Sequence, residues 1–591
     1  MLTILIILPL VVAALLALVM GKRSSYIKYV AIAASLLSLA LIANAYLSAG
    51  QLQQFSWFNL AGYTFALTTS TMPLNMLLLL IVGIMTPLIA IYSAGYMDLP
   101  SEQQRYYFEL CIFAAAMMLF AISGDLLTMF IGWELLGITS YLLIGFWYRR
   151  DGTADAARKA ITTILIGDIL MISAMVIIWA TYHTFSFALL LSATTHSGAM
   201  AIALLLVMFA AFTKSAQFPF HEWLPDAMKG PTPVSAFLHS STMVKAGVFL
   251  LAVLLPLFIA YHLLYLMLAF GLITAVLGVT NALAEFNIKR VLAYSTIEDL
   301  GLMFIALGTG SLVAAMMLFV AQTFYKALLF MSAGSMIKAN DSEEDMCKMY
   351  GSTKYMKLFI PTAIGVASLA GLFPLSGFFG KAAVLTSSNL IVYIALLVVS
   401  FGGNIYIFRW LFLPTHKKAD RKAAQVKKNY RSTPLSMMIP IYLLAAAVLA
   451  AGFFIYYGIP TYLNGYQSAP VSIGAEDIIA STIVVIIGFI VAYMLFYVRD
   501  KKSTEEHGIL RKILYNNQAV NSAYAALATA VSYASKAIDS VDYAIYGLIK
   551  EGAHNVNALG NLIKKIVSGS PTVYIAAFVI GLVVVVAILI L

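Results

Sequence analysis

Long apolar stretches set the strongest constraint on how this chain can fold. A helix needs about 20 apolar residues to cross a bilayer, and about sixteen segments meet that requirement. We therefore predict an all-α, polytopic transmembrane helical bundle of about 16 spans. The expected spans are 2–20, 27–48, 72–94, 107–123, 126–147, 159–181, 199–220, 234–255, 260–284, 290–308, 312–337, 358–387 (broken), 389–413, 435–457, 477–498 and 571–591.

Composition leaves little room for a soluble domain. Hydrophobic residues make up 62% of the chain and charged residues only 10%, against about 25% charged in a typical soluble domain. The two cysteines, Cys111 and Cys347, form no disulfide or metal-binding pattern. The first apolar run has no basic region before it and no obvious cleavage site, so we interpret it as a span and not as a signal peptide.

The Lys and Arg residues that give the chain its net charge of +10 lie in alternate loops. Lys and Arg occur near residues 22–28, 149–159, 289–290, 348–357 and 417–431, whereas 49–71, 182–199, 256–261, 308–311 and 458–475 contain neither. This is the positive-inside pattern. It predicts a multi-pass protein of the cell or inner membrane, with both termini on the outer face and the basic loops in the cytoplasm. We expect lipid contacts for the basic run and no nucleic-acid partner.

Ionisable residues inside the apolar stretches are the main functional signal. A charge at the bilayer centre costs roughly 3 kcal/mol or more, so it usually faces a watery cavity or a partner. Several such groups recur in this chain, which favours an ion or proton conductor over a passive anchor. They are Glu134, Lys214, Lys245, Lys326 and Lys381.

Two spans carry helix-breaking residues close to these lysines. Pro219 lies five residues after Lys214, in the stretch FPFHEWLP (218–225). Pro374 lies seven residues before Lys381, in the stretch AGLFPLSGFFGK (370–381). Backbone breaks at membrane depth are tolerated only where protein or water satisfies the freed polar groups. Paired breaks are typical of transporters built from inverted repeats; packing kinks are the alternative.

The C-terminal part has a different character. Residues 499–570 are helix-prone and amphipathic but too polar to span, and 571–591 is a final anchoring span. We expect a long lateral helix on the cytoplasmic side of the membrane or against neighbouring subunits. A broken helical hairpin and a coiled coil are the alternatives.

Four long motifs resemble the antiporter-like subunits of respiratory complex I, which are related to subunits of multisubunit sodium/proton antiporters and membrane-bound hydrogenases. They are FIGWELLGITSYLLIGFW (130–147), KSAQFPFHEWLPDAMKGPTPVSAFLHSSTMVKAG (214–247), NIKRVLAYST (287–296) and FYKALLFMSAGSMI (324–337). The C-terminal helix and anchor look like the L-type subunit. The resemblance implies N-terminal helices over 1–106, inverted five-helix repeats over 107–255 and 260–413, a loop and two spans over 414–498, and a helix bracing M- and N-type subunits.

The resemblance also implies roles for the ionisable residues of the first repeat. Glu134 matches the family's membrane glutamate and Lys214 its seventh-span lysine, so movement of the acid would switch the proton affinity of the lysine. A static buried ion pair is the alternative. Asp168 matches a family acid, but Leu165 replaces the arginine that usually precedes it. Lys245 departs from many L-type subunits, which have a non-basic residue there.

In the second repeat, Lys326 matches the central lysine and Lys381 the exit-side lysine. His239 matches a family histidine and either bridges the relay or is an ordinary hydrogen-bonded core histidine. A snorkelling lysine is the alternative for Lys381. Family members usually carry two histidines shortly before the central lysine. At those two positions this chain has Leu318 and Gln322.

Two adjacent acids, Glu298 and Asp299, lie in the tenth span, where family members more often have uncharged polar residues. They point about 100° apart on a helix, so one can face Lys326 while the other faces a cavity. We therefore expect one of them to be the acidic partner of Lys326. The alternative places both at the cytoplasmic edge of the span.

These features predict a proton-translocating, non-redox subunit of a complex I-like NADH/quinone oxidoreductase, coupled to electron transfer elsewhere. We expect no cofactor and no metal in this chain. A sodium/proton antiporter subunit and a membrane-bound hydrogenase subunit are the alternatives, and co-purifying subunits would distinguish them.

Overall fold

The computed structural model describes residues 2–20, 26–46, 50–60, 63–192, 197–349, 356–415, 433–466 and 471–498, together with Thr529. The chain divides into two compact units, Met1–Tyr515 and Asn516–Leu591. The predicted lateral helix (499–570) and terminal anchor (571–591) lie outside the described residues, except for Thr529, which is helical.

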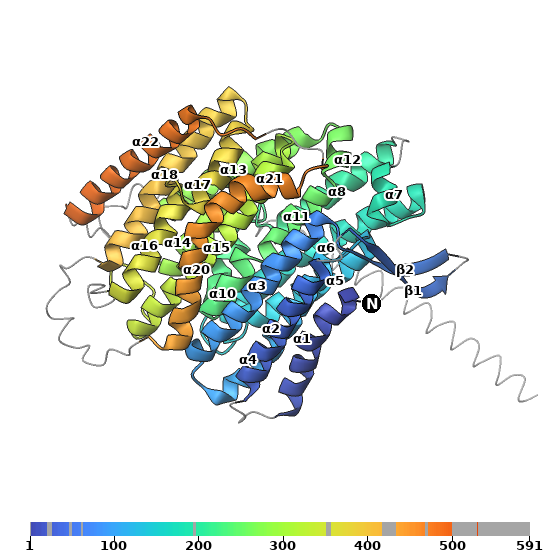
Figure 1. The fold of residues 1–591 in the computed structure, drawn as a ribbon, viewed down its shortest axis with the longest axis horizontal. Helices are drawn as coiled ribbons and strands as arrows, with labels where there is room; N and C mark the ends of the chain where they lie inside the picture. The colour runs from blue at the N-terminus through green and yellow to red at the C-terminus, as the bar shows by residue number, and fades with distance from the viewer. Residues whose placement is uncertain are drawn as a thin grey trace, which may run out of the picture. The chain divides into compact units, whose positions relative to one another are not determined.

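The first unit is a helical bundle (Figure 1). Prolines at the first helical position begin α3 and α4, where their missing N–H costs nothing. The first half contains α1 (Leu2–Val19), α2 (Ile27–Tyr46), α3 (Pro73–Tyr96), α4 (Pro100–Ala121), α5 (Leu126–Ile144), α6 (Thr153–Tyr182), α7 (Phe187–Ser192), α8 (Gly198–Lys214), α9 (Trp223–Asp226), η1 (Ala227–Lys229), α10 (Thr232–Ser240), η2 (Met243–Lys245), α11 (Ala246–Val253) and α12 (Leu255–Ala260).

The second half continues without strands in its described part. Side chains of Asn287 and Ser311 cap its two central helices at their N-termini. The elements are α13 (Leu264–Ala284), α14 (Ile288–Gly308), α15 (Leu312–Ala339), α16 (Met356–Ala370), α17 (Ser376–Thr386), α18 (Leu390–Thr415), α20 (Leu435–Phe453), η4 (Phe454–Gly458), α21 (Ile459–Tyr462), α22 (Ala475–Ala492) and η5 (Tyr493–Val498).

The all-α prediction is wrong for the segment between α2 and α3. Strands β1 (Leu52–Leu60) and β2 (Tyr63–Ser70) form an antiparallel hairpin, with Leu52 opposite Ser70 and a bulge between Ser56 and Phe58. Aromatic and Thr side chains favour strands, and the backbone groups of this short segment pair with each other. The remaining described elements are helical.

Eleven described helices are long and apolar enough to cross a membrane. Three shorter apolar helices, within α1, α8 and α16, are also present in the described part. The chain is therefore a multi-pass membrane protein. The predicted count of about 16 spans remains a prediction, because it includes 571–591 and relies on joining helices across breaks.

Both predicted breaks occur as interruptions in the helices. Helix α8 ends at Lys214, five residues before Pro219, and α16 ends at Ala370, four residues before Pro374. The span expected over 234–255 is also interrupted. There, α10 ends at Ser240, and the 3-10 turn η2 places Lys245 just before α11.

Helices α14 and α15 are the most deeply buried part of the bundle, where α13 packs against α14, and α10 and α17 pack against α15 (Figure 1). Helix α13 approaches α14 closely at Gly278, where an added Cβ would lie 2.6 Å from the backbone nitrogen of Glu298. A larger residue there would displace the helix that carries both central acids. The small residue thus sets the position of the cluster described below.

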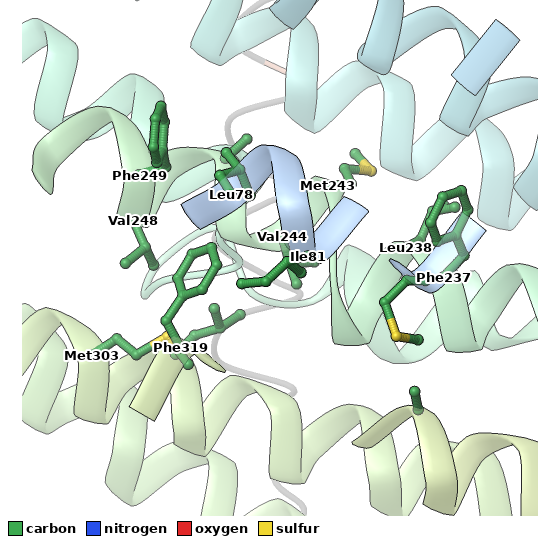
Figure 2. Close-up of a cluster of buried hydrophobic side chains, with 14 of the residues drawn as sticks. Leu78, Ile81, Phe237, Leu238, Met243, Val244, Val248, Phe249, Met303 and Phe319 are labelled. Carbon is green, nitrogen blue, oxygen red and sulfur yellow. The ribbon is translucent and has the colours of Figure 1, made fainter. Parts of the chain in front are cut away.

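An apolar cluster surrounds the interruption at η2 (Figure 2). It joins Leu78 and Ile81 of α3, Phe237 and Leu238 of α10, Met243 and Val244 of η2, Val248 and Phe249 of α11, Met303 of α14 and Phe319 of α15. All of these side chains are buried. The cluster excludes water from the backbone beside Lys245, so polar groups there depend on protein partners.

Candidate proton-transfer site

The centre of the site is an ion pair between α14 and α15. Asp299 Oδ2 lies 3.1 Å from Lys326 Nζ, and both side chains are almost fully buried. The Tyr325 hydroxyl donates to Asp299 Oδ2 at 3.0 Å, and the Lys326 ammonium donates to Ser295 Oγ. Neither acid lies at an edge of the span, because Glu298 and Asp299 occupy the middle of α14.

The second lysine reaches both acids from α17. Lys381 Nζ lies 3.6 Å from Glu298 Oε1 and 3.8 Å from Asp299 Oδ1. The Tyr406 hydroxyl of α18 donates to Glu298 Oε2 at 2.5 Å. Lys381 is only 8% exposed and turns inward to these carboxylates, so it does not snorkel. Asp299 therefore contacts both lysines of the second half.

Lys245 is held without a carboxylate contact. Its Nζ donates to Phe319 O at 2.6 Å and to Thr323 Oγ1, and lies 4.4 Å from the Phe319 ring centroid. Within the part of the chain that the structure describes, Lys245 has no ion-pair partner at 4 Å or less. Lys245 is thus anchored on α15, at Thr323, one helical turn before Lys326.

Lys214 contacts neither Glu134 nor Asp168 at ion-pair distance in the described structure. Its Nζ donates to Trp133 O and lies 4.0 Å from the Trp133 ring centroid. The Trp133 indole donates to Asp168 Oδ1 at 2.7 Å. Trp133 therefore contacts both Lys214 and Asp168. The contact ion pair considered as a static alternative for Glu134 and Lys214 is therefore not formed.

Glu134 lies near the outer surface of the bundle. It is half-buried, and its neighbours Leu135 and Ile138 on α5 are 38% and 53% exposed. One carboxylate oxygen, Oε1, is buried without a hydrogen-bond partner in the described structure. Glu134 and Asp168 lie close enough to interact. The acid is thus partly exposed at the edge of the bundle, whereas Lys214 is fully buried.

His239, on α10, packs against Trp223 of α9 and Phe330 of α15, with 6.3 Å between its ring centroid and each of theirs. Neither ring nitrogen has a protein hydrogen-bond partner among the described residues. Gln322 Nε2 lies 3.5 Å from the backbone oxygen of His239. Gln322, at a position where relatives usually have histidine, therefore lies beside His239.

Buried polar atoms without a hydrogen-bond partner recur around these residues. Buried polar groups are nearly always hydrogen-bonded, to protein or to ordered water. Water is therefore expected at such atoms, and water can carry protons between side chains that do not touch. Among the described residues they include Ser215 Oγ, Gln217 Oε1, Ser235 Oγ, His239 Nδ1 and Nε2, Gln322 Oε1 and Ser332 Oγ.

Ion pairs connect α9, which follows the helix break after Lys214, to α6 and to α14. Asp226 of α9 lies 2.7 Å from Lys159 of α6 and 3.9 Å from Arg290 of α14. Burial raises the pKa of the Glu222 carboxyl. His221, Lys159 and Arg290 lower this pKa by more, so it lies below its usual value. Glu222 is therefore ionised and takes part in this network.

Several contacting residues were not identified from the sequence. Trp133, Ser295, Thr323, Tyr325 and Tyr406 each hydrogen-bond a predicted site residue. Their side chains carry no charge, so their presence in an apolar span gives no signal of its own. In the described part of the chain, no group of three His, Cys, Asp or Glu residues could hold a metal ion.

The chain is similar to known membrane proteins. Residues 123–406 match the family described as NADH:quinone oxidoreductase/Mrp antiporter, TM. The chloroplast NAD(P)H-quinone oxidoreductase subunit 5 of Mesostigma viride is 33% identical over 498 residues, which is 77% of this chain and 75% of the relative. Subunit 5 of the Paulinella chromatophora organellar chromatophore is 38% identical over 353 residues, which is 56% of this chain and 53% of the relative.

Among solved structures, a chain of the Mrp complex of a Dietzia species has the same fold. It superposes with a TM-score of 0.73 at 23% identity, over 90% of this chain and 60% of that chain. This chain spans about half to three quarters of the length of the two curated relatives.

Proposed function

The chain belongs to the NADH:quinone oxidoreductase/Mrp antiporter family, and from that premise we propose that it is the L-type proton-translocating subunit of a complex I-like NADH/quinone oxidoreductase. The observation that carries the proposal is the buried cluster of Asp299, Glu298, Lys326 and Lys381. Ionisable groups buried at membrane depth are costly even when they are paired, and such residues typically mark ion or proton pathways. No redox cofactor is assigned to this subunit; electron transfer occurs elsewhere in the complex.

In the proposed relay, protons pass from Lys214 to Lys245, then to Lys326 and Lys381. His239 and Gln322, with water at their unpartnered atoms, support transfer into the central cluster. The carboxylates stabilise whichever lysine is charged. Burial disfavours the charged form of a lysine and a nearby carboxylate favours it, so small movements of either group switch the proton affinity.

The switch in the first repeat is proposed to involve two acids. Asp168, held by the Trp133 indole, would supply Lys214 with a fixed counter-charge, while Glu134 is only half-buried. Movement of Glu134 in response to a neighbouring subunit would change the charge felt by Lys214 through space. This arrangement transmits a signal from the subunit surface to the first lysine of the relay.

Proton entry is proposed at a cavity of about 250 Å³ beside the ends of α3 and α15. It is lined by the bases Arg150, Lys229, Lys289 and Lys338 and by the acids Asp98, Glu102 and Glu344. Tyr96 also lines it, and its hydroxyl hydrogen-bonds with Thr232 Oγ1 at 3.0 Å. Ser235 and His239 follow Thr232 on the same face of α10. This face leads from the cavity toward Gln322.

The overall organisation is proposed to follow the family. Residues 107–255 and 260–413 would be inverted repeats, with the interruptions after Lys214 and Ala370 in equivalent places. The segment 499–570 would brace M- and N-type subunits from the cytoplasmic side, and both termini would lie outside. Truncation before Asn516 tests the bracing role: we expect loss of the chain from the purified complex, and normal assembly would contradict it.

Lys245 gives a reason to keep an antiporter or hydrogenase assembly as the second candidate. A lysine there is more like M-, N- and antiporter-type proteins than L-type ones. Affinity purification through a tag on this chain separates the candidates. Quinone-site and iron–sulfur subunits would support the proposal, whereas small antiporter subunits or a nickel hydrogenase would favour the alternatives.

The transport role is tested on that purified complex after reconstitution into liposomes. Lys214→Ala and Glu134→Ala are expected to reduce proton translocation while the complex still assembles. Normal translocation by both variants would contradict the proposed relay.

A further inference from the structure

Polar residues follow one face of each of two neighbouring helices at the edge of the second repeat. On α18, Tyr393, Ser400 and Asn404 are spaced by seven and four residues, so they lie on one face. On α22, Asp477 and Ser481 are four residues apart and also share a face. The two helices pack side by side (Figure 1). We call the shared face the α18/α22 seam.

The two helices run parallel along this seam, and contacts near its two ends hold them. The Tyr393 hydroxyl donates to Asp477 Oδ1 at 3.1 Å. Eleven residues farther along, Gly488 lies against Asn404, where an added Cβ would be 2.5 Å from Asn404 Cβ. Eleven helical residues span roughly 16 Å. The polar face therefore covers about half of a bilayer core.

A small cavity lies in the seam between these contacts. It has a volume of about 20 Å³, and its polar lining comes from Lys381, Ser400, Asn404 and Ser481. A cavity of that size holds about one water molecule. Asn404 Nδ2 and Ser481 Oγ are buried and lack a hydrogen-bond partner among the described residues. Two unpartnered polar groups in a cavity of this size indicate a bound water.

Lys381 connects this cavity to the central cluster. It contacts Glu298 and Asp299, and it also lines the cavity. A proton on Lys381 can thus move toward the acids or toward the seam. Asp477, 8% exposed, lies toward the opposite end of the seam, near the start of α22.

We propose that the α18/α22 seam is the outlet through which protons leave Lys381, a role that rests on the proposed transport function. The Lys381 ammonium gives a proton to the cavity water while that water passes one onward. The proton then reaches the Asp477 carboxylate or bulk water beyond it, and Lys381 is left neutral. One positive charge moves along the seam, and no bond other than N–H and O–H changes.

Helix α22, which forms one side of the seam, lies outside the part of the chain that matches the family. The match ends at residue 406, whereas Asp477 and Ser481 belong to α22. Asp477 also accepts the backbone N–H of Gly474 at 2.9 Å and so caps α22. Because a change at Asp477 would weaken that cap, Ser481 and Asn404 are the better positions for a test.

The test uses the assembled complex in liposomes. Ser481→Leu and Asn404→Leu fill the cavity with an apolar side chain, and Ile483→Leu, on the exposed side of α22, is the matched control. We expect the two seam variants to lose proton translocation and Ile483→Leu to retain it. Lys326→Ala is measured in parallel as the test of the transport function itself.

A labelling experiment keeps the outlet testable if the leucine variants do not assemble. Ser481→Cys should react with a small charged methanethiosulfonate added on the side that Asp477 faces, and Ile483→Cys should not. One combination of results would rule out the seam as the outlet while leaving the transport function intact. In that case Lys326→Ala stops translocation, the two leucine variants translocate protons normally, and Ser481→Cys does not react. Translocation that survives Lys326→Ala would contradict both.

Discussion

Asp299 and Lys326 form a buried ion pair across α14 and α15, with 3.1 Å between Oδ2 and Nζ. At an effective dielectric constant of 20, two unit charges at this distance attract by about 5 kcal/mol. Removing one partner of a buried pair leaves the other charge uncompensated. The state of Lys326 therefore depends on Asp299 more directly than on any other acid in the described structure.

Asp299→Asn is expected to slow proton translocation by about tenfold or more, because a positioned proton-transfer group contributes at least that much. Asn keeps the size of the side chain but removes the counter-charge of Lys326. Translocation by the reconstituted complex is the measurement, and Asp299→Glu is the control that keeps the charge. Glu298→Gln should have a smaller effect on Lys326, since Glu298 contacts Lys381 instead. Equal, full activity in Asp299→Asn and Glu298→Gln would contradict this assignment.

A histidine at position 322 should partly offset the loss in Asp299→Asn. Gln322 lies beside His239, and an imidazole there supplies a second group that titrates near neutral pH. The double variant Asp299→Asn/Gln322→His is therefore expected to translocate protons faster than Asp299→Asn alone. Gln322→Leu in the same background is the control that adds no titratable group; equal rates in both double variants would count against the idea.

Asp168→Asn is expected to impair translocation at least as strongly as Glu134→Gln. Trp133 joins Asp168 to Lys214, because its indole donates to Asp168 Oδ1 and its backbone oxygen accepts from the Lys214 ammonium. Glu134 Oε1, in contrast, has no hydrogen-bond partner among the described residues. Trp133→Phe keeps the aromatic ring beside Lys214 but removes the indole hydrogen bond to Asp168, so an intermediate loss is expected. The comparison is made by translocation rates in one reconstituted series. A strong effect of Glu134→Gln with none from Asp168→Asn would restore a switch based on Glu134 alone.

The charged members of the site could be predicted because an ionisable group in an apolar span is costly wherever it lies. Lys326, Lys381, Glu298 and Asp299 come together in the structure. Which acid serves which lysine could not be predicted, because that depends on the rotation of α14 against α15 and α17. Trp133 was missed because its role is a contact between helices.

The helical bundle was predictable from the length of its apolar segments, and both proline-marked interruptions are present. The β1–β2 hairpin was missed because the segment was interpreted only as a loop between spans. The interruption at η2 was missed because no proline or glycine lies between Ser240 and Lys245. There the apolar cluster and the contacts of Lys245 determine the backbone, and these are tertiary.

Arg409→Ala is expected to destabilise the bundle by roughly 3 kcal/mol or more, since hydrogen bonds to a charged donor are strong and their loss leaves buried carbonyls unpaired. The Arg409 guanidinium donates to the carbonyls of Ala282, Leu283 and Glu285 at the end of α13. A lower apparent Tm of the purified protein checks this. Arg158→Ala, which removes an exposed ion pair, should leave Tm unchanged.

Cys347 is expected to react with maleimide at a rate that keeps rising from pH 7 to pH 9. Burial, together with Asp345, raises the pKa of this thiol to about 11. The thiolate is the reactive form, so its fraction grows about tenfold for each pH unit below the pKa. Labelling should occur from the side of the basic loops. A rate that levels off near pH 8.5, or labelling only from the opposite side, would contradict the environment or the topology described here.

The most direct measurement is proton translocation by the complex carrying Lys326→Ala, compared with Lys348→Ala. Lys348 lies in the segment after α15, where its exposed side chain pairs with Asp345 at 3.6 Å. Both variants are reconstituted at equal amounts, and assembly of the complex is verified first. We predict loss of translocation for Lys326→Ala and nearly normal translocation for Lys348→Ala. Normal translocation in an assembled Lys326→Ala complex would contradict the account.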